Sequence, residues 1–381
     1  MTQGVTSNEI LVASSCAVTG AFAAVGDPIL VGTRAYFDMV NAGGGIDGRR
    51  IRLLHRDDGY DPEKARAAFR YFTEEERVFA LVSLFGPPAV AATLDDIHQL
   101  GIPVVYFATG MGELYVERAE TFAEGANCYP IQPIHITEGR IMAVRAKADF
   151  GAKRIGVIYT SDAIGTDLNT GVTMQCARMG LDCTAVRVVA DSAYVSAAVS
   201  RIREANVDFI IVASSQISFP AIVHELVAQD LRLPAMTTYV NTVRTLADQV
   251  VDAIRGRFDL YAPGWFNYVG EHAVNLEIAS EWLGDYVMNG YAHCGWCAGH
   301  FFCEGLRRLS GREVTWESFR DAMEAAPIRN PFGGEIDYAN GQRLGTQEMS
   351  LYRLDLRSPT GWYEIDGLRS MDELLHRGEK E

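Results

Sequence analysis

The chain has 381 residues, of which 48% are apolar and 22% are charged, a balance typical of a well-packed globular protein and not of a disordered one. Lysine and arginine total 34 against 49 aspartate and glutamate, so the formal charge is −15, which argues against a nucleic-acid partner. No run of apolar residues is long enough for a membrane-spanning helix, and the length suits two α/β lobes.

In the first part of the chain, short apolar runs alternate with amphipathic stretches, which predicts parallel strands joined by helices. Pro28 is placed in the first turn of the first helix, where its missing N–H costs nothing. The expected strands are 10–13, 51–54, 79–82 and 103–107, and the expected helices are 28–41, 62–76 and 89–100.

The same alternation restarts near Thr137 and predicts a second α/β unit of similar size. Beyond Pro263 helices dominate, and a late strand at 350–354 is expected to pair with an earlier sheet. The expected helices are 137–150, 165–179, 195–205, 219–229, 271–288, 293–309 and 316–325, and the strands are 154–159, 184–189, 208–212 and 235–237.

Two motifs invite a sharper interpretation. The glycine-rich run 43–48 matches G-x-G-x-x-G, but it follows a helix and precedes a strand, the reverse of a dinucleotide site, so we interpret it as a helix stop and turn. The segment 293–300 places His293, Cys297 and His300 on one helical face, which leaves metal binding, redox chemistry through Cys294 and Cys297, and close helix packing open. Packing is favoured, and we expect no metal and no cofactor.

Catalytic signatures are lacking from the sequence, which has no G-x-S-x-G, no P-loop and no H-E-x-x-H. Asp57 and Asp58 are adjacent on an extended segment, so their side chains are expected to point to opposite faces. Among the seven cysteines, Cys176 and Cys183 flank a predicted helix end and strand start, where a bridge is geometrically feasible but is not established by spacing. We expect no catalytic residue.

Three loops follow predicted strands at their carboxyl ends, where open α/β sheets bind ligands. They span 85–90, 107–112 and 213–217, and they are rich in small residues. Such residues let a ligand approach the backbone, and the first N–H groups of the following helix can hold a carboxylate.

Several segments together resemble the type I periplasmic solute-binding proteins of the branched-chain amino acid (leucine/isoleucine/valine) ABC transporter class. The resemblance runs from residue 4 to about residue 355, and it rests on the order and spacing of its motifs. They are the start at 4–10, the loop 18–26, the turn 41–49, the "DDGYDP" run at 57–62, and the short matches at 108–110 and 332–334.

This resemblance implies two Rossmann-like lobes joined by a three-crossover hinge, with ligand held between lobes that close around it. Residues 1–130 with 263–345 are expected to form lobe 1, and 131–262 with 346–381 lobe 2. It also implies a periplasmic, monomeric, non-enzymatic protein that docks onto an ABC permease in the inner membrane, with the signal peptide absent from this chain.

The sequence departs from the amino-acid binders at their ligand-binding positions. Ala89 and Val90 replace hydroxyl groups, Ile164 replaces an aromatic residue, and Tyr239 stands where the resemblance places an acid for the ligand ammonium. We therefore expect a small apolar or aromatic ligand, with a carboxylate favoured over a zwitterionic amino acid.

The expected ligand-binding residues combine an aromatic cover, small loop residues and hydrogen-bonding side chains. They are Phe22, Ala89, Val90, Ala108, Thr109, Gly110, Ile164, Ser215, Gln216 and Tyr239. Thr109 and the backbone at Gly110 are assigned to the carboxylate, and Ser215, Gln216 and Tyr239 to hydrogen bonds from the second lobe.

Three alternatives remain. The chain could be a ligand-sensing regulator like the amide sensors of the same superfamily, which needs a partner protein and no permease. It could bind branched-chain amino acids. It could also be a redox enzyme that uses Cys294 and Cys297, which requires an accessible thiol of low pKa.

Overall fold

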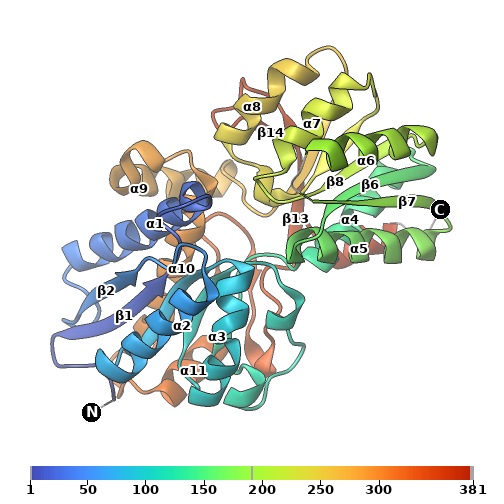
Figure 1. Ribbon diagram of the computed structural model, residues 1–381. Coiled ribbons are helices and arrows are strands. Elements are labelled where there is room, and N and C mark those ends of the chain that lie inside the picture. The colour runs from blue at the N-terminus through green and yellow to red at the C-terminus, as the bar shows by residue number, and fades with distance from the viewer. Residues whose placement is uncertain (1, 190–191, 378–381) are drawn as a thin grey trace. The chain divides into compact units, whose positions relative to one another are not determined.

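The computed structural model describes residues 2–189 and 192–377. The chain divides into two compact units: unit 1 comprises Met1–Gln132 and Tyr268–Thr346, and unit 2 comprises Pro133–Asn267 and Gln347–Glu381. The chain therefore passes between the units three times. Each unit is an α/β layer structure, with a parallel sheet in unit 1 and a mixed sheet in unit 2 (Figure 1), which confirms the predicted fold class.

Unit 1 contains a five-stranded parallel sheet in the order β2-β1-β3-β4-β5. Its strands are β1 (Glu9–Ser15), β2 (Arg50–Arg56), β3 (Ala80–Phe85), β4 (Val104–Ala108) and β5 (Cys128–Tyr129). Its helices are α1 (Ala23–Ala42), α2 (Pro62–Arg70), α3 (Pro87–Leu100), α9 (Ala273–Leu283), α10 (Gly290–Arg307) and α11 (Trp316–Glu324), with a π-helical turn at Tyr71–Glu75 and a short ladder of β11 (Ile328–Arg329) and β12 (Glu335–Ile336).

Unit 2 contains a seven-stranded sheet in the order β14-β13-β10-β9-β8-β6-β7. Its strands are β6 (Arg154–Thr160), β7 (Asp182–Val188), β8 (Phe209–Ala213), β9 (Ala235–Thr237), β10 (Leu260–Gly264), β13 (Glu348–Leu354) and β14 (Trp362–Ser370). Its helices are α4 (His135–Ala148), α5 (Ala163–Met179), α6 (Ser192–Glu204), α7 (Phe219–Ala228), α8 (Arg244–Ile254) and α12 (Met371–Arg377). The late strand β13 pairs antiparallel with β10, as expected for a strand returning to an earlier sheet.

Some of the expected element and unit boundaries need correction. The first helix begins at Ala23 and not at Pro28, so the proline lies inside α1, where it removes one hydrogen bond. The segment 263–267 belongs to unit 2 and not to lobe 1, because β10 pairs with β9 and β13 of the second sheet. Helix α8 and strand β14 were not predicted.

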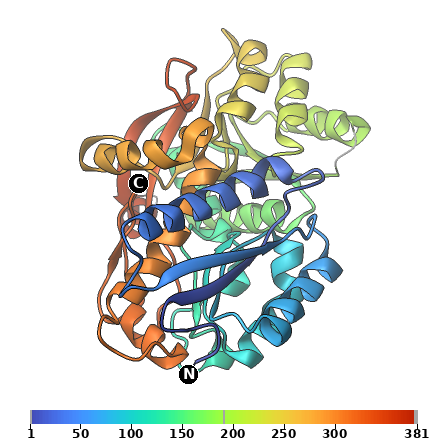
Figure 2. The same ribbon diagram turned by 90° about the vertical axis from the view of Figure 1, so that its left-hand side faces the viewer.

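Helices α1 and α10 lie side by side in unit 1 (Figure 2), and glycines allow their backbones to touch. A Cβ at Gly32 would lie 1.9 Å from the carbonyl oxygen of Ala292, and one at Gly295 would lie 1.9 Å from that of Ile29. The small residues of the 293–300 segment therefore allow the two helices to pack closely, in agreement with the interpretation that the sequence favoured.

The glycine-rich turn after α1 lies between that helix and β2, an order that does not fit a dinucleotide site. Gly45 has φ +78°, and a Cβ there would lie 2.0 Å from the carbonyl oxygen of Arg49. Only glycine fits at this position because the chain both turns with positive φ and folds back onto its own backbone.

Candidate functional site

Unit 1 carries an aromatic cluster at the carboxyl ends of its strands. Phe22, the residue before α1, stacks on Tyr60 with ring centroids 3.8 Å apart, and Phe85 packs edge-on at 6.3 Å from Phe22. Tyr60 has φ +68°, and its ring covers Gly86, where a Cβ would lie 2.3 Å from a ring carbon. A left-handed non-glycine residue is costly and is concentrated at functional sites, so Tyr60 joins Phe22 as a candidate.

Two neighbouring parallel strands of this sheet share an unusual backbone feature. Ser83 in β3 has φ +57° and Tyr106 in β4 has φ +75°, each two residues before the end of its strand. The register skips both residues, since Leu81 and Val82 pair with residues 104 and 105 and the pairing resumes at Leu84. These irregularities redirect the strand ends that lead into the loops predicted to bind ligand.

The loop after β4 places a buried, unsatisfied hydroxyl beside this cluster. Ala108 packs against the group of apolar side chains that contains Phe22, Tyr60 and Phe85. The next residue, Thr109, is 4% exposed, and its Oγ1 has no hydrogen-bond partner among the described residues. Gly110 is buried as well. An unpaired buried hydroxyl is expected to bond a ligand or a water.

Ala89 and Val90, the candidate residues that follow β3, lie in the interior of unit 1. Ala89 and Val90 are 5% and 1% exposed near the start of α3, and Val90 packs in the main core of unit 1. Both line a cavity of about 10 Å³ together with Asp58 and Phe69. That cavity holds one water molecule at most, so it cannot hold a ligand as it stands.

The two adjacent carboxylates point apart, as their alternation predicted. Asp57 accepts hydrogen bonds from the Val18 N–H and the Thr19 hydroxyl, whereas Asp58 accepts from the Ser15 hydroxyl at 2.6 Å and the Tyr60 N–H at 2.8 Å. Burial raises the pKa of the Asp58 carboxyl. These carboxylates hold the strand-end loops together and do not converge on one ligand group.

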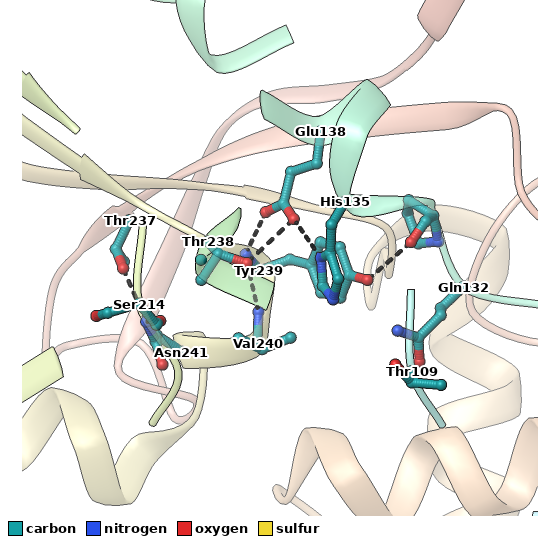
Figure 3. Close-up of polar contacts among 12 residues, drawn as sticks. Thr109, Gln132, His135, Glu138, Ser214, Thr237, Thr238, Tyr239, Val240 and Asn241 are labelled. Carbon is teal, nitrogen blue, oxygen red and sulfur yellow. Dashed lines mark hydrogen bonds and ion pairs between the residues drawn. The ribbon is translucent and has the colours of Figure 1, made fainter. Parts of the chain in front are cut away.

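Unit 2 is organised around a fully buried carboxylate. Figure 3 shows Glu138 of α4 facing the turn after β9. Its Oε1 accepts from the Tyr239 N–H at 2.7 Å, and its Oε2 accepts from the Thr238 hydroxyl at 3.1 Å and lies 3.0 Å from Nδ1 of His135. The two oxygens therefore accept from three donors, and these bonds hold the turn after β9 in place.

Tyr239 is fixed at both ends. Its ring stacks on His135 with centroids 5.3 Å apart, and its hydroxyl donates to the carbonyl oxygen of Pro133 at 2.8 Å. Only 6% of the residue is exposed. The predicted role of its hydroxyl as a ligand donor would compete with this backbone bond, whereas the rigid ring remains suited to packing against a ligand.

The other second-unit candidates gather at the start of α5. Asp162 caps this helix by accepting from the Gly165 N–H at 2.8 Å, and the Ser215 hydroxyl donates to the same carboxylate at 3.2 Å. Ile164 lies in the first turn of α5, partly buried against the core, and Gln216 is half-buried in the loop after β8. Ser215, Ile164 and Asp162 are thus brought together. Tyr239 belongs to a separate group, in which Glu138 bonds His135, Thr238 and Tyr239 and which we call the Glu138 group.

Unit 2 also holds unsatisfied polar atoms close to the Glu138 group. The Ser214 hydroxyl is buried without a partner among the described residues. Asn241 donates to the Ser214 carbonyl at 3.0 Å and to the Thr237 hydroxyl at 2.8 Å (Figure 3), while its own Oδ1 is buried and unpaired. Both atoms are available to a polar group of a ligand.

Comparison with known proteins identifies the family. A model of the periplasmic binding protein family matches residues 9–360. The chain belongs to this family. The prediction made from the sequence motifs is thereby confirmed.

Solved structures of binding proteins superpose over nearly the whole of both chains. A fatty acid ABC transporter substrate-binding protein from Thermomonospora curvata has a TM-score of 0.82 at 17% identity and covers 98% of this chain and 95% of its own. A branched chain amino acid ABC transporter from Thermus thermophilus with bound valine has a TM-score of 0.83 at 14% identity, covering 98% and 99%. At such identities the likeness establishes the fold.

A relative from Pseudomonas aeruginosa, described as an amino acid binding protein, is 23% identical over 163 residues. The match covers 43% of this binding protein and 42% of the relative, less than half the length of either.

Among residues 2–189 and 192–377, no helix has both the length and the apolar character needed to cross a membrane.

The histidine- and cysteine-containing segment of α10 does not form a metal site in the described part of this binding protein. His293 Nε2 lies 2.8 Å from the Val287 carbonyl oxygen, which can only accept, so Nδ1 accepts from the Tyr268 hydroxyl at 2.7 Å. Cys297 bonds the amide oxygen of Asn330 instead, at 3.2 Å. Burial raises the pKa of Cys294 to about 12, whereas thiol redox chemistry needs a lowered pKa. Burial also lowers the pKa of His293 to about 4, so its ring stays neutral.

Sequence reasoning missed Tyr60, Glu138 and Asn241. Tyr60 carried a signal, since it follows a predicted turn in the conspicuous 57–62 segment. Glu138 had none, because it reads as an ordinary polar residue in the first turn of a helix, and its partner Tyr239 lies 101 residues away.

Proposed function

We propose that this protein is the substrate-binding protein of an ABC importer, which captures a small apolar or aromatic ligand, preferably a carboxylate, and releases it unchanged to a permease. Membership of the periplasmic binding protein family supports the transport role and a periplasmic location. The ligand class rests on one observation: the carboxylate beside position 239 is fully buried and already bonded to three groups of the protein, which leaves it unsuited to a ligand ammonium.

We assign candidate contacts within each unit separately. In unit 1, the rings of Phe22 and Tyr60 would cover the apolar part of the ligand, and the unpaired Thr109 hydroxyl with the Gly110 backbone would hold its carboxylate. In unit 2, we assign hydrogen bonding to the loop after β8 and apolar contact to the turn after β9. The residues assigned there are Ile164, Ser214, Ser215, Gln216, Tyr239 and Asn241.

A branched-chain amino acid is the second candidate ligand. It is favoured by the valine-bound structure from Thermus thermophilus and by the description of the Pseudomonas aeruginosa relative. The fatty acid ABC transporter substrate-binding protein from Thermomonospora curvata favours the first. An ammonium group would need an acid among the candidate residues, and in unit 2 the Asp162 carboxylate, which accepts from the Gly165 N–H and the Ser215 hydroxyl, is the acid placed beside them.

A thermal-shift panel is the first test. Aromatic acids, fatty acids of graded length, amides and branched-chain amino acids are added to the full chain, and the melting temperature is read. A ligand that binds only the folded state, at 100 times its Kd, stabilises it by about 2.7 kcal/mol. We expect a shift with apolar or aromatic acids and none with leucine. A shift with leucine alone would refute the proposed ligand class.

Phe22→Ala tests the aromatic cover with whichever acid gives the largest shift. Removing one face of a ring stack costs about 0.5–1.5 kcal/mol in addition to the lost apolar area, so we expect affinity to fall about tenfold by calorimetry. Tyr363→Ala is the matched control, because this ring is 57% exposed on β14. Equal affinities for wild type and Phe22→Ala would remove Phe22 from the site.

A further inference from the structure

One pair of cysteines in unit 2 has no role in the proposed function. All seven cysteines are thiols in this structure, and Cys16, Cys128, Cys176, Cys297 and Cys303 are buried. Cys183 is partly exposed and packs against the core group that contains Cys176. A hydrogen bond between the two side chains raises the pKa of the Cys176 thiol and lowers the pKa of the Cys183 thiol.

The local backbone explains why these two residues meet. Helix α5 ends at Met179, and Gly180 follows in the left-handed conformation with φ +65°. The Leu181 N–H bonds the Cys176 carbonyl at 3.0 Å, and the Gly180 N–H bonds the Ala177 carbonyl at 3.4 Å. This pair of bonds is a Schellman motif, which reverses the chain and brings the residues after the glycine against the last turn of the helix.

The strand that follows places Cys183 on the side of the helix. Residues 181 and 183 lie on the same face of an extended segment, and both pack against the core group that contains Cys176. The intervening Asp182 is exposed. Cys183 pairs with Ile155 at the beginning of β6, so the thiol pair lies at the amino end of the parallel strands. The candidate ligand residues near Asp162 follow the opposite, carboxyl end of β6.

We propose that Cys176 and Cys183 form an intramolecular disulfide when the protein meets a small-molecule disulfide in an oxidising compartment. A structural bridge of this kind is expected of proteins that work outside the reducing cytosol. Because seven is odd, at least one cysteine stays unpaired, and the four other fully buried thiols are shielded from the oxidant.

The exchange proceeds in two steps. Cys183, the more exposed thiol, attacks one sulfur of the small disulfide as its thiolate, and the first small thiol leaves with the proton that Cys183 has lost. The hydrogen bond from Cys176 lowers the pKa of the Cys183 thiol, which favours this order. The Cys176 sulfur then loses its proton to water and attacks the mixed disulfide at Cys183, releasing the second small thiol. Two protein thiols are oxidised and one small disulfide is reduced.

The test uses the full-length chain and oxidised glutathione. After incubation, remaining thiols are alkylated in denaturant without reductant, and the protein is weighed intact and mapped by peptide mass spectrometry. We expect alkylation of the five other cysteines only, so that the protein is lighter by two alkyl groups than the fully reduced and alkylated protein, and one bridge that joins the peptides of Cys176 and Cys183. The melting temperature of the oxidised protein should exceed that of the reduced protein, and a reductant should reverse the difference.

Two variants make the result specific. Cys183→Ser should abolish the bridge, while Cys294→Ser, which alters the other partly exposed cysteine, should leave it intact. Alkylation of both Cys176 and Cys183 after oxidation would overturn the proposal, as would a bridge elsewhere or a stable glutathione adduct at Cys183. Because the pair lies away from the carboxyl strand ends, ligand affinity should be the same in both redox states, so this result is independent of the ligand assignment.

Discussion

Replacing Glu138 with alanine is expected to destabilise unit 2 by roughly 3–5 kcal/mol, the usual cost of removing one partner of a buried polar pair. The side chain is 0% exposed and accepts from the Tyr239 N–H and the Thr238 hydroxyl, with His135 as its third partner. Alanine would leave these groups buried without an acceptor, and each unsatisfied donor costs about 1–3 kcal/mol. Equilibrium urea unfolding measures the change.

Two further variants separate hydrogen bonding from general disruption. Glu138→Gln keeps one oxygen for the Tyr239 N–H and offers an amide N–H₂ to the Thr238 hydroxyl, so it should cost about 1–2 kcal/mol. Glu204→Ala, an exposed glutamate at the end of α6, should change stability by less than about 0.5 kcal/mol. If alanine and glutamine at position 138 both lowered the unfolding free energy by less than about 1 kcal/mol, the Glu138 group would not be what holds the turn after β9.

Acid is expected to destabilise unit 1 as the pH falls from about 6.5 to 4. Burial lowers the pKa of both His293 and His300 to about 4, so the folded state keeps each ring neutral where the unfolded chain is already protonated. A depressed histidine pKa contributes stability that is fully present above the unfolded value of about 6.5 and is lost as the pH falls through the folded value. The shift at His293 corresponds to roughly 3 kcal/mol.

The variant His293→Gln isolates this effect. A glutamine amide can donate to the Val287 carbonyl and accept from the Tyr268 hydroxyl, as the neutral ring does, but it does not titrate. Unfolding free energies measured at pH 7, 5.5 and 4 should therefore fall less steeply for this variant than for wild type. His224→Gln, at an exposed histidine of α7, serves as control and should retain the wild-type slope. Parallel slopes for wild type and His293→Gln would contradict the prediction.

Local chemistry made much of the fold predictable. Asp61 caps α2 by accepting from two N–H groups of its first turn, and Gly101 ends α3 with φ +74°. Both helix boundaries are therefore determined by a few neighbouring residues. The missed helix α8 was also recognisable, since Leu246, Val250 and Ile254 repeat at helical spacing. Strand β14 was harder, because Tyr363 and Ile365 are exposed and the strand pairs only on one side, at the edge of the sheet.

The alternation of strands and helices, the family and the loops that follow the strand ends could be predicted from the sequence, because periodicity, caps and motif order are local properties. Which side chains meet could be learned only from the folded chain. Phe22 stacks on Tyr60 because two loops end at the same sheet edge, and Glu138 reaches Tyr239 because α4 packs beside the turn after β9. Such pairings depend on packing across long stretches of chain, which spacing along a single sequence does not encode.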